Sequence, residues 1–158
     1  MTRVIILSTL LCLSACGLMK GRPDLPAFDL LMIDSATVLD TKQIPGGKPI
    51  VLIYFSPDCD HCQKLTSSIL SDMQDMKDIR FYFITVDPFA RLKVFNKYYK
   101  IYKYPNIVLG RDYNFFYPKF INTFNTPHIA LYDGDKKLRV VFVGGTDAHR
   151  LVNEIDNL

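Results

Sequence analysis

The feature that most constrains the fold is an apolar strand that leads directly into two cysteines. Residues 50–55 form an unbroken apolar and aromatic run, the pattern of a strand that is covered on both faces of a sheet. Ser56-Pro57-Asp58 ends the run, and after Cys62 the apolar residues recur at helical spacing. Cys59 and Cys62 are therefore predicted at a helix N-terminus, where unpaired backbone N–H groups and the helix dipole favour a thiolate.

The spacing of the two cysteines indicates redox chemistry. Two intervening residues on a first helical turn bring the sulfurs within disulfide reach and leave the first thiol at the exposed end. Cys59 would attack a substrate disulfide, and Cys62 would resolve the mixed disulfide. A purely structural disulfide here would close too small a loop to stabilise the fold much. A zinc site would need a second ligand pair, and no second Cys-x-x-Cys and no His-x-x-x-His follows residue 16.

The first residues are predicted to be a signal and an anchor. Arg3 precedes an apolar run, residues 4–13, which is too short to span a bilayer as a helix. Residues 13–16 (Leu-Ser-Ala-Cys) resemble the bacterial lipobox. On that resemblance, residues 1–15 are a lipoprotein signal peptide that is removed, Cys16 carries a diacylglyceryl anchor, and residues 16–26 are a lipidated tether. The alternatives are a plain signal peptide cut elsewhere or a buried N-terminal strand.

Residues 27–158 are predicted to form one domain. The 158 residues are 49% hydrophobic and 22% charged, as in an ordinary globular chain, and a formal charge of +3 is too small to indicate a polyanionic partner. The tract 91–119 is basic and rich in aromatic residues, a pattern that also occurs where bases stack. Because an exported protein meets little nucleic acid, we expect no nucleic-acid partner and interpret the tract as a solvated face over a packed aromatic core. An acidic partner or a membrane surface ranks second.

Strands and helices alternate along the rest of the chain, which predicts a mixed sheet with helices on both faces. Asp87-Pro88 is interpreted as a helix start, with Asp87 as the N-cap and Pro88 at the first helical position, and Asp133-Gly134 between β-rich runs as a hairpin turn. The strands are expected within residues 27–33, 37–44, 50–55, 79–86, 106–109, 129–132 and 137–143. The helices are expected within 62–76, 88–102 and 147–155, with a short aromatic helix or turn within 112–120.

Two parts of the chain resemble the thioredoxin superfamily. Residues 50–62 look like its strand, active-site loop and helix start, and Thr126-Pro127 before residues 129–134 is similar to its cis-proline loop and hairpin. The extra helix and strand at about 88–109 resemble the central insertion of the TlpA/ResA-like, envelope-anchored branch. The resemblance implies an α/β thioredoxin-like fold, a central mixed β-sheet flanked by helices, with a helix–strand insertion between the Cys-x-x-Cys helix and the cis-proline loop.

The resemblance also implies a function. Pro127 would be cis and pack against the cysteines, and the Thr126 backbone would pair with a substrate strand. The protein would be a thiol–disulfide oxidoreductase without a cofactor, anchored by lipid in the bacterial cell envelope and facing the periplasm. It would reduce protein disulfides and would itself be reduced by a membrane electron-transfer partner.

The site departs from the family pattern at several positions. Asp58 replaces the tryptophan that usually precedes the first cysteine, and Ile53 stands where thioredoxin carries a buried acid. Proton transfer at the second cysteine must then use water or another group, such as Asp58 or Asp60. Between the cysteines, a donating or cationic His61 would stabilise the thiolate, whereas Asp58 and Asp60 would raise the thiol pKa. The sequence leaves the balance of these effects on the redox potential open.

Two rival functions remain. His128 directly follows Pro127, which permits a non-enzymatic copper-binding or redox-sensing module with Cys59, Cys62 and His128 as ligands. A lone histidine at such a place is more often a satisfied groove or surface residue. The second rival is a binding domain that keeps only the fold. Peroxidase chemistry fits poorly, because Ser56 stands where peroxiredoxin-like sites carry a threonine.

Overall fold

The computed structural model describes residues 24–158 and confirms the predicted order of strands and helices. The predicted signal peptide and Cys16 lie outside the described residues. Within them, no helix combines the length and the apolar character needed to cross a membrane. The strands are β1 (Asp29–Met32), β2 (Val38–Asp40), β3 (Ile50–Tyr54), β4 (Arg80–Thr85), β5 (Ile107–Arg111), β6 (His128–Tyr132) and β7 (Leu138–Val143). The helices are α1 (Asp60–Ser71), α2 (Phe89–Tyr99), α3 (Phe116–Phe120) and α4 (Ala148–Asp156).

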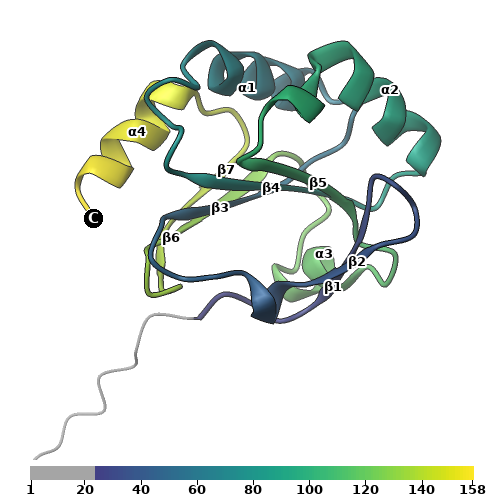
Figure 1. The fold of residues 1–158 in the computed structure, drawn as a ribbon, viewed down its shortest axis with the longest axis horizontal. Coiled ribbons are helices and arrows are strands. Elements are labelled where there is room, and N and C mark those ends of the chain that lie inside the picture. Colours follow the sequence, from purple (N-terminus) through teal and green to yellow (C-terminus); the bar gives the residue numbers. More distant parts are fainter. Residues whose placement is uncertain (1–23) are drawn as a thin grey trace, which may run out of the picture.

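The seven strands form one mixed sheet in the order β2-β1-β5-β4-β3-β6-β7. β3, β4 and β5 run parallel, while β6 pairs with β3 and β1 pairs with β5 in antiparallel fashion. Helices α1, α2 and α4 cover one face of the sheet, and α3 lies against the other (Figure 1). The predicted insertion is thus α2 with β5, and β5 is an integral strand that joins the N-terminal hairpin to the centre of the sheet.

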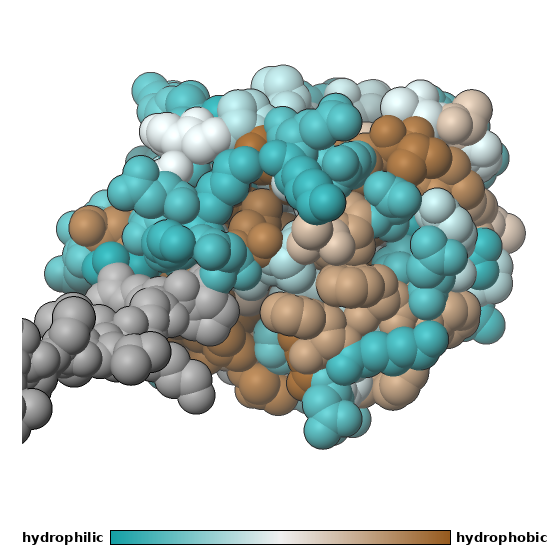
Figure 2. All heavy atoms as spheres, turned by 90° about the horizontal axis from the view of Figure 1, so that it is seen from below, coloured by the Kyte–Doolittle hydropathy of each residue, from teal (hydrophilic) through white to brown (hydrophobic). Residues whose placement is uncertain are grey.

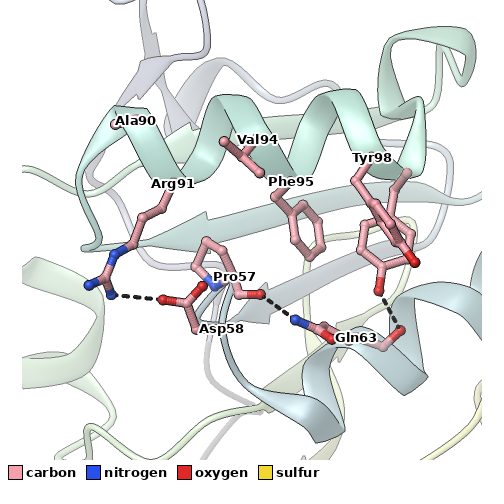
Figure 3. Close-up of a pocket in the computed structure, with 9 residues that line it drawn as sticks. Pro57, Asp58, Gln63, Ala90, Arg91, Val94, Phe95 and Tyr98 are labelled. Atoms are coloured by element: carbon pink, nitrogen blue, oxygen red, sulfur yellow. Dashed lines mark hydrogen bonds and ion pairs between the residues drawn. The ribbon is translucent and has the colours of Figure 1, made fainter.

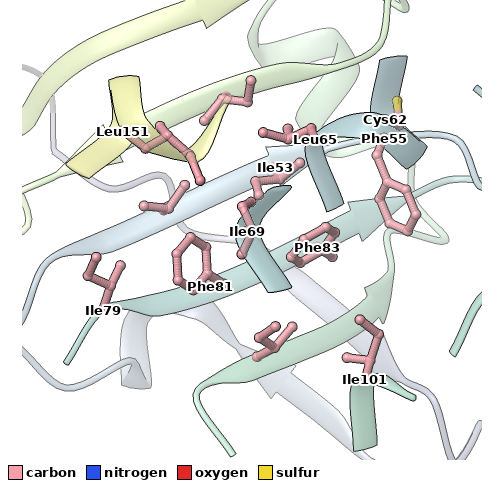
Figure 4. Close-up of a cluster of buried hydrophobic side chains, with 14 of the residues drawn as sticks. Ile53, Phe55, Cys62, Leu65, Ile69, Ile79, Phe81, Phe83, Ile101 and Leu151 are labelled. Atoms are coloured by element: carbon pink, nitrogen blue, oxygen red, sulfur yellow. The ribbon is translucent and has the colours of Figure 1, made fainter. Parts of the chain in front are cut away.

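Side chains along the central strands alternate between two cores, because successive strand residues point to opposite faces. On the face that α1 and α4 cover, Ile53 and Phe55 pack with Leu65, Ile69 and Leu151 (Figure 4). On the α3 face, the alternate residues of β3 pack with Tyr117. Each large apolar side chain buried in this way contributes about 1.5–3 kcal/mol. The first core therefore fixes α1, and with it the cysteine pair, to the sheet.

The start of α2 differs from the predicted one. The N-cap is Pro88, in an extended conformation (φ −60°, ψ 145°) and without a side-chain capping bond. The Asp87 carboxylate instead accepts a hydrogen bond from the Thr85 hydroxyl (3.2 Å) and pairs with Arg91 (3.5 Å). The predicted cap at Asp87 is therefore wrong, since its carboxylate is turned toward the end of β4 and the first turn of α2.

The basic and aromatic tract 91–119 does not form a single surface. The sheet separates α2, on the α1 side, from α3, on the opposite side (Figure 1). Tyr117 is fully buried, but Tyr98 is 77% and Tyr102 is 67% exposed. Apolar side chains also reach the surface on the face seen from below in Figure 2. The prediction that the aromatic residues of the tract are packed in the core is thus confirmed for Tyr117. It is wrong for Tyr98 and Tyr102, which face solvent.

Candidate active site

The cysteine pair lies where strand β3 gives way to helix α1. The Phe55 N–H donates to the carbonyl of Ile84 (2.9 Å), and the Cys59 N–H donates to the carbonyl of Ser56 (3.1 Å), which closes the connecting turn. Cys59 is the N-cap of α1, and its Sγ accepts a hydrogen bond from the backbone N–H of Cys62 (3.3 Å). The predicted position at a helix N-terminus is confirmed, with the sulfur itself serving as the capping group.

The two thiols differ in exposure. Both are free; Cys59 is half-buried and Cys62 is 1% exposed. Cys62 lies in the core among the side chains of α1 and β3 (Figure 4). Cys59 is only partly buried and packs against this core. An incoming disulfide can therefore meet Cys59 first.

The pKa values of the two thiols are shifted in opposite directions. Burial acts to raise the pKa of Cys59, but hydrogen bonds from the Cys62 thiol, Thr126 and the backbone N–H groups of Cys62 and His61 outweigh it and lower this pKa. Burial, together with the hydrogen bond to Cys59, raises the pKa of Cys62 to about 12. The site thus combines one thiol that ionises readily with one that holds its proton.

This asymmetry predicts the pH dependence of alkylation. Because the pKa of Cys59 is lowered, a larger fraction of it is thiolate at neutral pH than in an ordinary cysteine, whose pKa is about 8.5. We expect its rate of iodoacetamide alkylation to rise with pH and to reach half its maximum at a lower pH than the rate of a free cysteine in an unstructured peptide. Replacing Cys62 by alanine removes one hydrogen bond and should move the midpoint upward. A wild-type midpoint at or above that of the peptide cysteine would contradict the assignment.

The loop before β6 lies against the cysteine pair. The Thr126–Pro127 peptide bond is cis, as the resemblance implied. The Thr126 carbonyl oxygen is 3.6 Å from Cys59 Sγ, and the Pro127 carbonyl accepts from the N–H of Gly144 (2.9 Å). The structure therefore brings Thr126, and with it the adjacent Pro127, next to the cysteine pair, although Thr126 is 67 residues distant from Cys59 along the chain.

The charged residues around the cysteines have different surroundings. The Asp58 carboxylate is engaged by Arg91 on α2 at 2.9 Å, while Asp60 and His61 are exposed residues of the first turn of α1. Arg91 was missed at the level of sequence, because it is distant from Asp58 along the chain and its only local signal is the four-residue spacing from Asp87. This pairing offsets part of the negative charge that Asp58 places beside Cys59.

His128 is not brought to the cysteines. As the first residue of β6 it alternates with Ile129, which faces the core that contains Cys62. The His128 Nδ1 lies 3.5 Å from the Tyr117 hydroxyl, and burial lowers the pKa of His128. Within residues 24–158, no group of three or more His, Cys, Asp or Glu side chains is arranged to hold a metal ion. Because successive residues of a strand point to opposite faces, the imidazole lies on the face away from Cys59 and Cys62, the thiolates of the copper-binding alternative.

A pocket of about 480 Å³ opens beside the active-site loop, between that loop and α2 (Figure 3). The Gln63 side chain closes one side by donating to the Pro57 carbonyl (2.9 Å), and the Tyr99 hydroxyl donates to the Gln63 carbonyl (3.4 Å). The pocket is lined by Pro57, Asp58, Gln63, Ala90, Arg91, Val94, Phe95, Tyr98 and Tyr99.

Several solved structures share this fold. A protein of Chlorobium tepidum assigned as a thiol:disulfide interchange protein DsbE superposes with a TM-score of 0.67 at 17% identity, over 87% of this chain and 96% of that one. A secreted Mycobacterium tuberculosis disulfide oxidoreductase gives 0.65 at 16% identity, over 83% and 96%. StoA from Bacillus subtilis gives 0.64 at 14% identity, over 84% and 98%. At such low identities the likeness shows the fold alone, and it confirms the predicted thioredoxin-like α/β fold with a mixed sheet flanked by helices.

Comparison of the sequence with curated proteins found no match. A family model described as a thioredoxin-like domain matches residues 40–158, which is most of the chain and includes the cysteine pair and the cis-proline loop. The seven-stranded sheet, the cysteines at the start of α1 and this match agree. The chain belongs to the thioredoxin-like family.

Proposed function

We propose that this protein is a thiol–disulfide oxidoreductase of the bacterial cell envelope that reduces protein disulfides through Cys59 and Cys62. The observation that carries the proposal is the asymmetry of the pair: the accessible thiol has a lowered pKa, and the buried one keeps its proton. Exchange chemistry needs such an attacking thiolate and a protected second thiol. Structural neighbours described as disulfide oxidoreductases and interchange proteins support the same activity.

The reaction proceeds in two exchanges. The Cys59 thiolate attacks one sulfur of the substrate disulfide, so that a mixed disulfide forms and the other substrate sulfur leaves as a thiolate that takes up a proton. Cys62 then loses its proton and attacks Cys59 Sγ, which releases the second substrate thiol. The substrate gains two electrons, and the protein is left with a Cys59–Cys62 disulfide. A dithiol donor, proposed to be a membrane electron-transfer partner, returns it to the reduced state.

The residues around the pair have supporting roles in this proposal. The backbone of Thr126, beside Cys59 and next to Pro127, pairs with an extended substrate segment. Asp58 and Asp60 oppose the ionisation of Cys59, and His61 favours it. Lipidation of Cys16, with removal of residues 1–15, would hold the domain at a membrane by the tether 16–26; the lipobox resemblance supports this part.

The reduction potential tests the direction of the reaction. The purified protein is equilibrated in glutathione buffers, and the oxidised fraction is read by thiol-specific mass labelling. A reductant is expected to have a reduction potential of about −270 mV for the Cys59–Cys62 pair, and an oxidant one of about −120 mV. A value at the oxidising end would overturn the reductase assignment. Failure to reduce insulin disulfides with a dithiol donor present would overturn the oxidoreductase proposal as a whole.

A further inference from the structure

The pocket between the active-site loop and α2 lies beside the path that a substrate must take. Pro57 and Asp58 form one wall and are the two residues directly before Cys59. Consecutive Cα atoms are about 3.8 Å apart, so this wall begins within one or two residues of the nucleophile. Cys59 itself does not line the pocket, but residues that flank the cysteine of a polypeptide bound at Cys59 are within reach of it.

The other wall is aromatic and aliphatic. Val94 is 70% and Tyr98 is 77% exposed, whereas Phe95 is buried beneath them. The rings support one another: the centroids of Phe95 and Tyr99 are 4.6 Å apart, and those of Tyr98 and Tyr99 are 4.9 Å apart with an edge-to-face angle of 77°. Rings held by such mutual contacts present a ready-made apolar surface (Figure 3).

The polar groups of the pocket are already paired with one another. Arg91 binds Asp58 at 2.9 Å and Asp87 at 3.5 Å. The Gln63 side chain donates to Pro57, and the backbone carbonyl of Gln63 accepts from Tyr99. No charged group that lines the pocket, among the described residues, is left without an opposite charge. Charge matching therefore favours an uncharged, apolar occupant over an anion or a cation.

We propose that this pocket binds a large apolar side chain, such as that of phenylalanine, next to the substrate cysteine that Cys59 attacks. The proposal rests on the proposed function and adds a substrate class to it: proteins whose disulfides are flanked by bulky apolar residues. A pocket of about 480 Å³ accommodates such a side chain with part of its backbone. Tyr98 and Val94 act as specificity-determining residues at its outer edge.

The test compares two peptides that differ only beside their cysteine. Each peptide carries one cysteine as a mixed disulfide with glutathione, flanked on both sides by phenylalanine in one peptide and by serine in the other. Rate constants for peptide release are measured with the full chain in its reduced form. We expect the phenylalanine peptide to react about tenfold faster, since burying an apolar side chain is worth more than 1.4 kcal/mol, the equivalent of a factor of ten.

Three variants at exposed positions test the pocket, two inside it and one outside as a control. Tyr98→Ser and Val94→Ser should each move the rate ratio of the two peptides toward one. Tyr102→Ser removes another exposed ring (67%, against 77% for Tyr98) close by in the chain but outside this pocket, and should keep the wild-type ratio. All three positions are exposed, so circular dichroism should show folded variants.

Each other outcome has a distinct meaning. Equal rates for the two peptides with wild-type protein would overturn the pocket proposal and leave the proposed function standing. No reaction with either peptide would overturn the proposed function. A Tyr102→Ser ratio that falls as far as that of Tyr98→Ser would also sink the pocket assignment. So would a dimer in analytical ultracentrifugation that Tyr98→Ser dissociates, because a second copy would then cover this face.

Discussion

Replacing Cys59 by serine is expected to reduce insulin reduction to the uncatalysed background, whereas replacing Cys62 by serine is expected to trap a mixed disulfide with the substrate. A serine hydroxyl does not ionise at neutral pH, so Cys59→Ser removes the only accessible nucleophile of the pair. In Cys62→Ser the first exchange still occurs, but no buried thiol remains to attack Cys59 Sγ. Insulin turbidity and mass spectrometry of the covalent adduct measure the two results.

The two variants control for each other. Both replace sulfur by oxygen, but Cys62 is buried and Cys59 only half-buried, so circular dichroism is used to check that each variant is folded. Only Cys62→Ser should accumulate adduct, and the double variant should accumulate none. Activity that survives Cys59→Ser, or adducts that form through Cys62, would reverse the roles assigned here and contradict the opposite pKa shifts of the two thiols.

The main elements of the fold were predictable because the sequence carries strong local signals for them. The run 50–55 is apolar at every position, and β3 is buried at every residue. Asp133-Gly134 begins the turn, residues 133–137, that joins β6 to β7, and Asp147 caps α4 by accepting from the N–H of Arg150 (2.9 Å). Turn residues, caps and periodicity act over a few residues, so a single sequence is enough to reveal them.

What escaped prediction depends on contacts between distant residues. Arg91 reaches Asp58 only because α2 packs across the active-site loop, and nothing local in either segment indicates the other. The exposed face of α2 carries aromatic residues such as Tyr98, and the sequence alone does not distinguish such a face from a buried one. His128 next to Pro127 suggested a position near the cysteines, yet the alternation of β6 turned its ring toward Tyr117. Adjacency in the chain therefore does not predict a shared face of the sheet.

Phe55 links the active-site strand to the pocket wall, and Phe55→Ala is expected to cost about 3–5 kcal/mol of unfolding free energy. The side chain is 1% exposed and packs edge-to-face on Phe83 (centroids 5.4 Å apart) and against Phe95 on α2 (4.9 Å). Truncation would open a cavity below both rings, one residue before the loop that leads to Cys59. Urea unfolding followed by circular dichroism measures the loss, since the chain has no tryptophan to report it.

An exposed phenylalanine serves as the matched control for this prediction. Phe124 is 63% exposed, so Phe124→Ala should change the unfolding free energy by no more than about 0.5 kcal/mol. Phe55→Leu keeps most of the apolar volume and should fall between the two alanine variants. If Phe55→Ala lowers the unfolding free energy by less than about 1 kcal/mol, the packing of α2 on the sheet does not depend on the Phe55 ring. The proposed apolar pocket would then lack the rigid floor on which its selectivity depends, because Phe95 rests directly on Phe55.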